Sequence, residues 1–136
     1  MVSPREGEMP MFERLALSRL AGALANHAAA RQAMVAENVA NADTPGYRAR
    51  DLRPFAELVE RGDMPMAVTR AGHQPDGLSS LRSPVDKGGE PAPNGNTVSL
   101  EGEMVTAAEI RHSHDLALAV YRSAGGIIRA SLGKAG

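Results

Sequence analysis

The chain has 136 residues, a formal net charge of −1 and no cysteine. These numbers exclude disulfide frameworks, cysteine-based zinc sites, thiol catalysis and the electrostatic capture of nucleic acid. The apolar fraction is 43%, but 23 of these residues are alanine and only two are Phe and two Tyr. Burial stabilises by about 25 cal/mol per Å² and alanine contributes little area, so the chain has modest means of building its own core. We therefore expect a helical protein whose stability depends on neighbouring molecules.

Residues 1–11 contain two prolines and three charged residues and have no apolar core segment. They predict a flexible, polar N-terminus rather than a cleavable secretory signal. No stretch of the chain approaches the ~20 apolar residues that a membrane-spanning helix needs. We expect the protein either to stay in the cytoplasm or to leave it by a route that needs no such signal.

Proline and glycine divide the chain into a helical, an irregular and a second helical part. Seven of nine prolines and seven of fourteen glycines lie between Ala42 and Asn96. The two flanks of this region, residues 12–41 and 99–132, contain no proline. This pattern predicts two long helices around an irregular middle. The expected parts are a flexible N-terminus (1–11), an N-terminal axial helix (12–41), a turn motif and irregular middle (42–98), a C-terminal axial helix (99–132) and a tail (133–136).

Both flanks repeat residues at spacings of three and four over about four heptads, which is the a/d pattern of a coiled coil. The fold class expected is mainly α, a coiled-coil pair of long terminal helices with a short helix, and optionally short strands, in the middle. The seam of the first helix is Leu17, Leu20, Leu24, His27, Arg31, Met34, Asn38 and Asn41. The seam of the second is Leu100, Met104, Ala107, Arg111, His114, Leu118, Tyr121, Gly125, Ile128 and Leu132.

The middle region carries weaker signals. Leu52–Arg61 predicts a short helix with proline tolerated in its first turn, Met66–Thr69 suits a short strand, and Arg70–Asn96 has the composition of a loop. Ser99 is the expected N-cap of the second long helix. The pair Gly125–Gly126 inside that helix costs about 2 kcal/mol relative to alanine and suits a frayed end, a close helix crossing or a bend.

The most specific stretch is AENVANADTPGY, residues 36–47. Asn38 and Asn41 lie three residues apart on one helix face, where their amides can reach terminal carbonyls or a neighbouring backbone. The Asp-Thr pair after them disfavours further helix, because these side chains compete for backbone hydrogen bonds. Pro45 and Gly46 suit the central positions of a type II turn. A plain helix end explains the turn but not the two asparagines.

This stretch resembles the Asn-x-x-Asn-x-x-Thr-Pro-Gly-Tyr signature of the bacterial flagellar axial proteins, the rod and hook family. The short chain, the run RARDL at 48–52 and the segment GNTVSLE at 95–101 resemble one short member of the proximal rod. A second, closely related proximal rod member is the alternative. The resemblance makes Asn38, Asn41, Thr44, Pro45, Gly46 and Tyr47 the family motif, with a role in assembly.

The resemblance implies a structural subunit, not an enzyme, without catalytic residues, cofactor, metal or small-molecule substrate. It implies terminal helices that pack helically around a central channel to form part of the drive shaft. The implied partners are other copies of the chain, other rod proteins, the membrane ring, the rod-ring adaptor and the flagellar export apparatus. The implied location is the basal-body rod in the periplasmic space, reached without a cleaved signal peptide.

Two other classes of function remain open. One is a soluble helical adaptor or export partner that binds another helix through its seam. The other is a small hydrolase that uses His114 and Asp115. His112 and His114 are two residues apart and do not share a helix face, so a joint metal site is not expected. No phosphate-binding glycine motif is present in the sequence.

Overall fold

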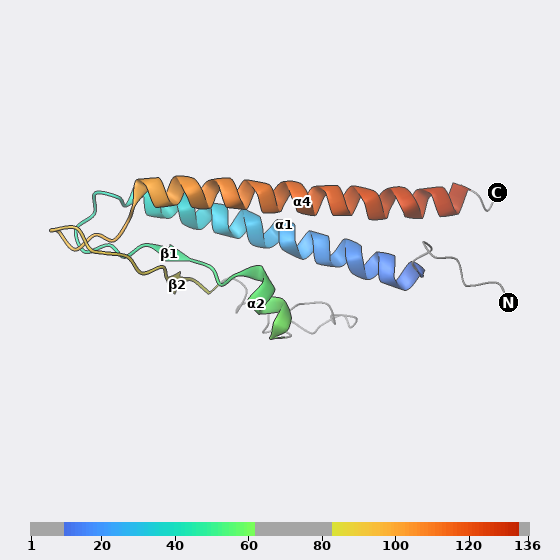
Figure 1. Cartoon of the computed structure of the whole chain (residues 1–136), viewed down its shortest axis with the longest axis horizontal. Coiled ribbons are helices and arrows are strands. Elements are labelled where there is room, and N and C mark those ends of the chain that lie inside the picture. Colours follow the sequence, from blue (N-terminus) through green and yellow to red (C-terminus); the bar gives the residue numbers. More distant parts are fainter. Residues whose placement is uncertain (1–9, 62–82, 134–136) are drawn as a thin grey trace, which may run out of the picture.

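The computed structural model describes residues 10–61 and 83–133, apart from the side chains of Ile127, Ile128 and Ser131. Helices α1 (Met11–Ala40) and α4 (Leu100–Gly133) lie antiparallel along one another as a hairpin (Figure 1). At 1.5 Å per residue they are about 45 and 50 Å long. The end of the hairpin at which α1 ends and α4 begins is called the tip below.

The short elements of the middle region lie alongside α1 (Figure 1). Strand β1 (Arg50–Asp51) pairs antiparallel with β2 (Val85–Asp86), with Arg50 opposite Asp86. Helix α2 (Phe55–Glu60) follows β1. These short elements place the loops around residues 45 and 95 together at the tip.

The expected fold class is confirmed, with a long helix at each end, a short middle helix and a small strand pair. Each long helix is displaced by one residue from the expected range. Ser99 caps α4 as expected, because its Oγ accepts the amide hydrogen of Gly102 at 3.1 Å. The segment Met66–Thr69, expected as a strand, lies outside the described residues.

Two details of the middle region differ from expectation. Helix α2 begins at Phe55 and not at Leu52, because Pro54 disfavours helical backbone in the residue before it. Strand β2 lies inside the range expected to be loop. A two-residue strand of this kind has no hydrophobic alternation to reveal it.

The line of contact between the long helices consists of apolar residues repeated every seven positions, and four of the six are alanine. Ala21, Ala28 and Val35 of α1 are buried, and so are Ile110, Ala117 and Ala124 of α4. Seven residues make two turns of a paired helix, so each set forms one straight row. Ala28, Val35 and Ile110 form the apolar core of the hairpin, with Ala107 packed against them. Alanine on both sides lets the helices approach closely.

The buried rows lie one position away from most of the predicted seam: Ala21 and Ala28 follow Leu20 and His27, and Ile110 and Ala117 precede Arg111 and Leu118. His27 and Asn38 of that seam are also buried, and Ala107 packs against the core. Leu17, Leu20, Leu24, Met34 and Leu118 are half-buried, Tyr121 and Leu132 are exposed, and the side chain of Ile128 lies outside the description.

Helix α4 continues through Gly125 and Gly126 to its end at Gly133. A Cβ atom at Gly126 would meet nothing within 4 Å, and one at Gly125 would only touch the end of Arg129 at 3.8 Å. Neither glycine is therefore required by packing within the subunit. Among the described helices, none has the length and apolar character that crossing a bilayer requires.

Candidate functional site

Asn38, the first asparagine of the motif, lies inside the tip and is only 1% exposed. Its amide pairs with both backbone groups of Arg50: Nδ2 donates to the carbonyl at 2.7 Å, and Oδ1 accepts the N–H at 3.0 Å. Nδ2 also donates to Glu103 at 3.2 Å, and Oδ1 accepts the Tyr47 hydroxyl at 3.2 Å. All four hydrogen-bonding positions of this amide are thus used within the chain.

Asn41, the second asparagine, ends α1. Its Nδ2 donates back to the carbonyl of Glu37 at 2.9 Å, and its Oδ1 accepts the hydroxyl of Thr44 at 3.1 Å. The expected turn follows, since the Thr44 carbonyl accepts the Tyr47 amide at 3.2 Å and Gly46 has φ +73°. A side chain at Gly46 would force an L-residue into the left-handed region.

Asn96, in the loop before α4, bonds to this turn and is 4% exposed. Its Nδ2 donates to the carbonyls of both Asn41 and Thr44, each at 2.8 Å. Its Oδ1 accepts the Val98 amide at 2.8 Å, which shapes the entry into α4. Both carbonyls lie just after α1 and also accept the backbone amides of Thr44 and Tyr47, so Asn96 adds a second hydrogen bond to each and ties the turn to the start of α4.

The loop before α4 pairs with the loop after α1 through three further bonds. Gly46 N–H donates to the Asn94 carbonyl and Thr97 N–H to the Tyr47 carbonyl, both at 2.9 Å. The Ala49 amide donates to the hydroxyl of Thr97, which is buried, at 2.8 Å. The two loops therefore form one hydrogen-bonded unit.

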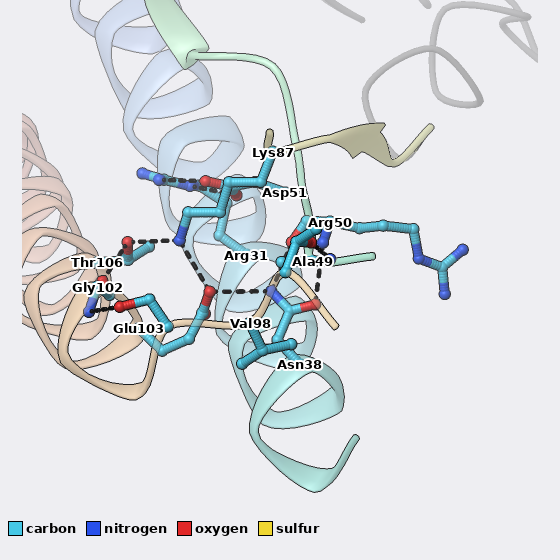
Figure 2. A network of polar contacts seen from close by, with 12 residues as sticks. Arg31, Asn38, Ala49, Arg50, Asp51, Lys87, Val98, Gly102, Glu103 and Thr106 are labelled. Carbon is cyan, nitrogen blue, oxygen red and sulfur yellow. Dashed lines mark hydrogen bonds and ion pairs between the residues drawn. The ribbon is translucent and has the colours of Figure 1, made fainter. Parts of the chain in front are cut away.

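Glu103 of α4 is a buried carboxylate, 2% exposed, at the centre of the tip. Figure 2 shows its Oε1 between the amide of Asn38 and the amine of Lys87, which donates at 2.9 Å. Lys87 also donates to the Thr106 hydroxyl at 2.9 Å. Because a buried charge is costly without a partner, Lys87 and Glu103 depend on one another.

A second ionic contact joins α1 to β1. Arg31 donates two hydrogen bonds to the Asp51 carboxylate, from Nε at 3.0 Å and from Nη2 at 2.8 Å. Burial opposes ionisation of Asp51, but these bonds and the one from the Leu52 amide outweigh it and lower its pKa. The same pairing raises the pKa of Arg31. A bidentate pair of this kind fixes orientation as well as charge.

His27 lies nearby and is buried. Its Nε2 donates to the Arg53 carbonyl at 2.8 Å, and its ring packs against Phe55 at a centroid distance of 5.5 Å. Burial lowers the pKa of His27, and the positive charge of Arg31 adds to this effect. The imidazole thus ties α2 to α1 in its neutral form.

Two exposed ion pairs, Arg50 with Glu37 and Arg48 with Asp86, lie at the surface of the same region. Exposed pairs contribute little to stability, because water and salt screen their charges. The order of the tip therefore rests on the buried amides and on the Lys87–Glu103 pair.

The structure brings the predicted motif together at the tip, with Asn38 bonded to Tyr47 and Asn41 to Thr44. Pro45 is exposed at the turn. The predicted seam residues lie along the helices and not in this network. Sequence reasoning missed Lys87, Asn96 and Glu103. The segment GNTVSLE pointed to the neighbourhood of Asn96, but nothing in the sequence distinguishes Lys87 from a surface lysine.

The other histidines do not converge with this network. His112 is exposed and His114 half-buried on α4, and His73 lies outside the described residues. Within residues 10–61 and 83–133, no three His, Asp or Glu side chains are placed to hold a metal ion. The described tip is a set of interlocking hydrogen bonds that closes a helical hairpin.

Comparison with known proteins identifies the family of the chain. Residues 17–48 match the family model described as "Flagella basal body rod protein". A flagellar basal body rod protein FlgB of Agrobacterium fabrum is 30% identical over 82% of this chain and 89% of its own length. FlgB of Salmonella typhimurium is 34% identical over 83% of this chain and 91% of its own length. FlgB of Escherichia coli is 33% identical over 68% of this chain and 75% of its own length. The chain therefore belongs to the FlgB family of flagellar basal body rod proteins.

Proposed function

We propose that this chain is a structural subunit of the proximal rod, polymerising through α1 and α4 with copies of itself and with other rod proteins. The family supports the rod as its location, as does the name shared by its relatives. The observation that carries self-association is the surface of α4. Only one side of α4 is covered by α1, and six of its large apolar residues are exposed: Leu100, Met104, Val105, Leu116, Tyr121 and Leu132.

Such a hairpin gains stability from association, because a partner that binds only the folded form shifts the folding equilibrium. An interface between two different faces that does not close generates a helical polymer, which suits a drive shaft around an export channel. The proposal includes contact with the membrane ring, the rod-ring adaptor and the export apparatus, and export to the periplasmic rod without a cleaved signal. It assigns the chain no catalytic role.

The test is helix content against concentration. Far-UV circular dichroism and sedimentation velocity on the purified chain should show little helix when dilute, and helix rising together with the formation of large species. A cooperative melt that does not depend on concentration, with a persistent monomer, would favour a helical adaptor instead. In cells lacking the resident protein, the chain should restore basal-body rods and motility.

A further inference from the structure

Two hollows lie in the groove between α1 and α4. The hollow nearer the tip, with a volume of about 480 Å³, lies between Ala29 and Gln32 of α1 and Arg111 and His114 of α4. It is called the tip hollow. Ala28, Ala107 and Ile110 also line it, so its surface is mainly apolar. Arg111 adds a positive charge at its edge.

The second hollow, of about 250 Å³, lies between Gly22 and Ala25 of α1 and Leu118 and Tyr121 of α4. Each of these four residues is seven positions from its counterpart in the tip hollow. Since seven residues are two turns, both hollows open on the same face, about 10.5 Å apart. The second hollow is lined mainly by apolar side chains.

The face of α4 that points away from the two hollows carries a stripe of residues spaced four and three positions apart. The stripe consists of Val105, Glu109, His112 and Leu116, all of which are exposed. Val105 is 60% and Leu116 52% exposed, although both are aliphatic. Glu109 and Leu116 are seven residues apart, which is also the spacing of the two hollows.

We propose that the outer stripe of α4 from a second copy lies in this groove, with its Glu109 at the tip hollow and its Leu116 in the second hollow. Glu109 then meets the guanidinium of Arg111. Leu116 fills the hollow lined by Leu118, Tyr121 and the small residues of α1. This inference rests on the proposed self-association and names the two faces that make it.

The chemistry of the hollows also sets the direction of the second copy. A parallel α4 brings the acidic residue to Arg111 at the tip hollow and the leucine to the second hollow. An antiparallel α4 would place the leucine against Arg111 and the carboxylate among apolar side chains, where it lacks a partner. The contact joins two different faces, so it is heterologous and repeats from subunit to subunit with one common orientation.

Cysteine cross-linking tests the contact, because the chain has no cysteine of its own. Two differently tagged variants, Leu116→Cys and Ala25→Cys, are produced together in cells that lack the resident protein, and their basal bodies are isolated and oxidised. We expect a disulfide-linked dimer carrying both tags. The matched control pairs Leu116→Cys with Ala56→Cys, an exposed site on α2, and should give at least tenfold less dimer.

Basal bodies that contain both variants but give no more dimer than the control would overturn this inference and leave the proposed function intact. If the isolated rods lack the chain altogether, even when the cysteine-free protein is produced, the proposed function would be overturned. Charge exchange provides a second measurement. Glu109→Arg and Arg111→Glu should each lower incorporation about tenfold, corresponding to about 1.4 kcal/mol. The double variant should recover it, and a double variant as poor as the singles would contradict the pairing.

Discussion

Asn38 of α1 and Glu103 of α4, 65 residues apart in the chain, share a hydrogen bond of 3.2 Å inside the tip. Both side chains are almost inaccessible to solvent. Asn38 is hydrogen-bonded to Arg50 of β1 and to Tyr47 of the turn. Glu103 is bonded to Lys87, which follows β2. The tip is therefore organised around a polar pair where a small apolar core would otherwise be expected.

Asn38→Ala should unfold the tip. It leaves the N–H and carbonyl of Arg50 without a partner, and each buried unsatisfied group costs about 1–3 kcal/mol. We expect a loss of about 3–5 kcal/mol, measured by denaturant titration at a chain concentration at which the parent is helical, and loss of assembly with expression intact. Asn26→Ala, an exposed site on the same helix, is the control. Equal losses in the two variants would contradict the assignment.

Lys87→Met should destabilise the fold by about 3 kcal/mol, because it leaves the Glu103 carboxylate buried without its countercharge. The double variant Lys87→Met, Glu103→Gln should be more stable than Lys87→Met alone, since the uncompensated charge is gone. The same denaturant titration measures these two variants and Glu103→Gln alone. A double variant whose loss equals the sum of the single losses would show that the two residues act independently.

Acid should destabilise the fold in two steps. The folded-state pKa of His27 is below its ordinary value of 6.5, so the unfolded chain binds a proton first and stability falls as pH drops below about 6.5. The pKa of Asp51 is also lowered, so a second loss begins below about 3.8. His27→Gln should remove the first step and keep the second in a pH series of thermal melts. Stability that rises on acidification from 7 to 5 would refute the sign.

Ala28→Leu should destabilise the hairpin by about 1–3 kcal/mol, because the added carbons force apart helices that meet at a 2% exposed alanine. Ala33→Leu, on an exposed position of the same helix, should leave subunit stability nearly unchanged. Tyr121→Ala, which removes a 56% exposed ring, should also have a small effect on the subunit. Thermal melts of the three variants test whether the row of small residues is the true contact line.

Gly125→Ala with Gly126→Ala should raise helix content, with a gain of about 2 kcal/mol in helix propensity. The new methyl groups meet no obstacle within the subunit. Circular dichroism measures the gain, and a swimming assay measures its consequence. Unchanged motility would dismiss a functional bend at this pair, and reduced motility would show that assembly needs the flexibility of the glycines.

The sequence was sufficient to predict both long helices, the Ser99 cap and the Pro45–Gly46 turn, because each depends on residues close together in the chain. It did not give the packing line. The large residues of the a/d pattern and the alanines one position away have the same periodicity. Which of the two sets forms the contact depends on the distance between the helices. Lys87 and Glu103 were missed for a related reason. Their pairing depends on how the middle of the chain folds back, which local pattern does not specify.

The hydrogen bonds from Asn96 to the turn after α1 have a consequence for the order of folding. The two carbonyls that it holds belong to Asn41 and Thr44, 55 and 52 residues earlier in the chain. During synthesis, α1 and its turn are therefore complete in sequence long before the residue that ties the turn to the start of α4 exists. The native tip is a late, high-contact-order event that must await the last third of the chain. A chain cut before residue 96 would keep α1 and its turn and still lack the side chain that ties them to the start of α4.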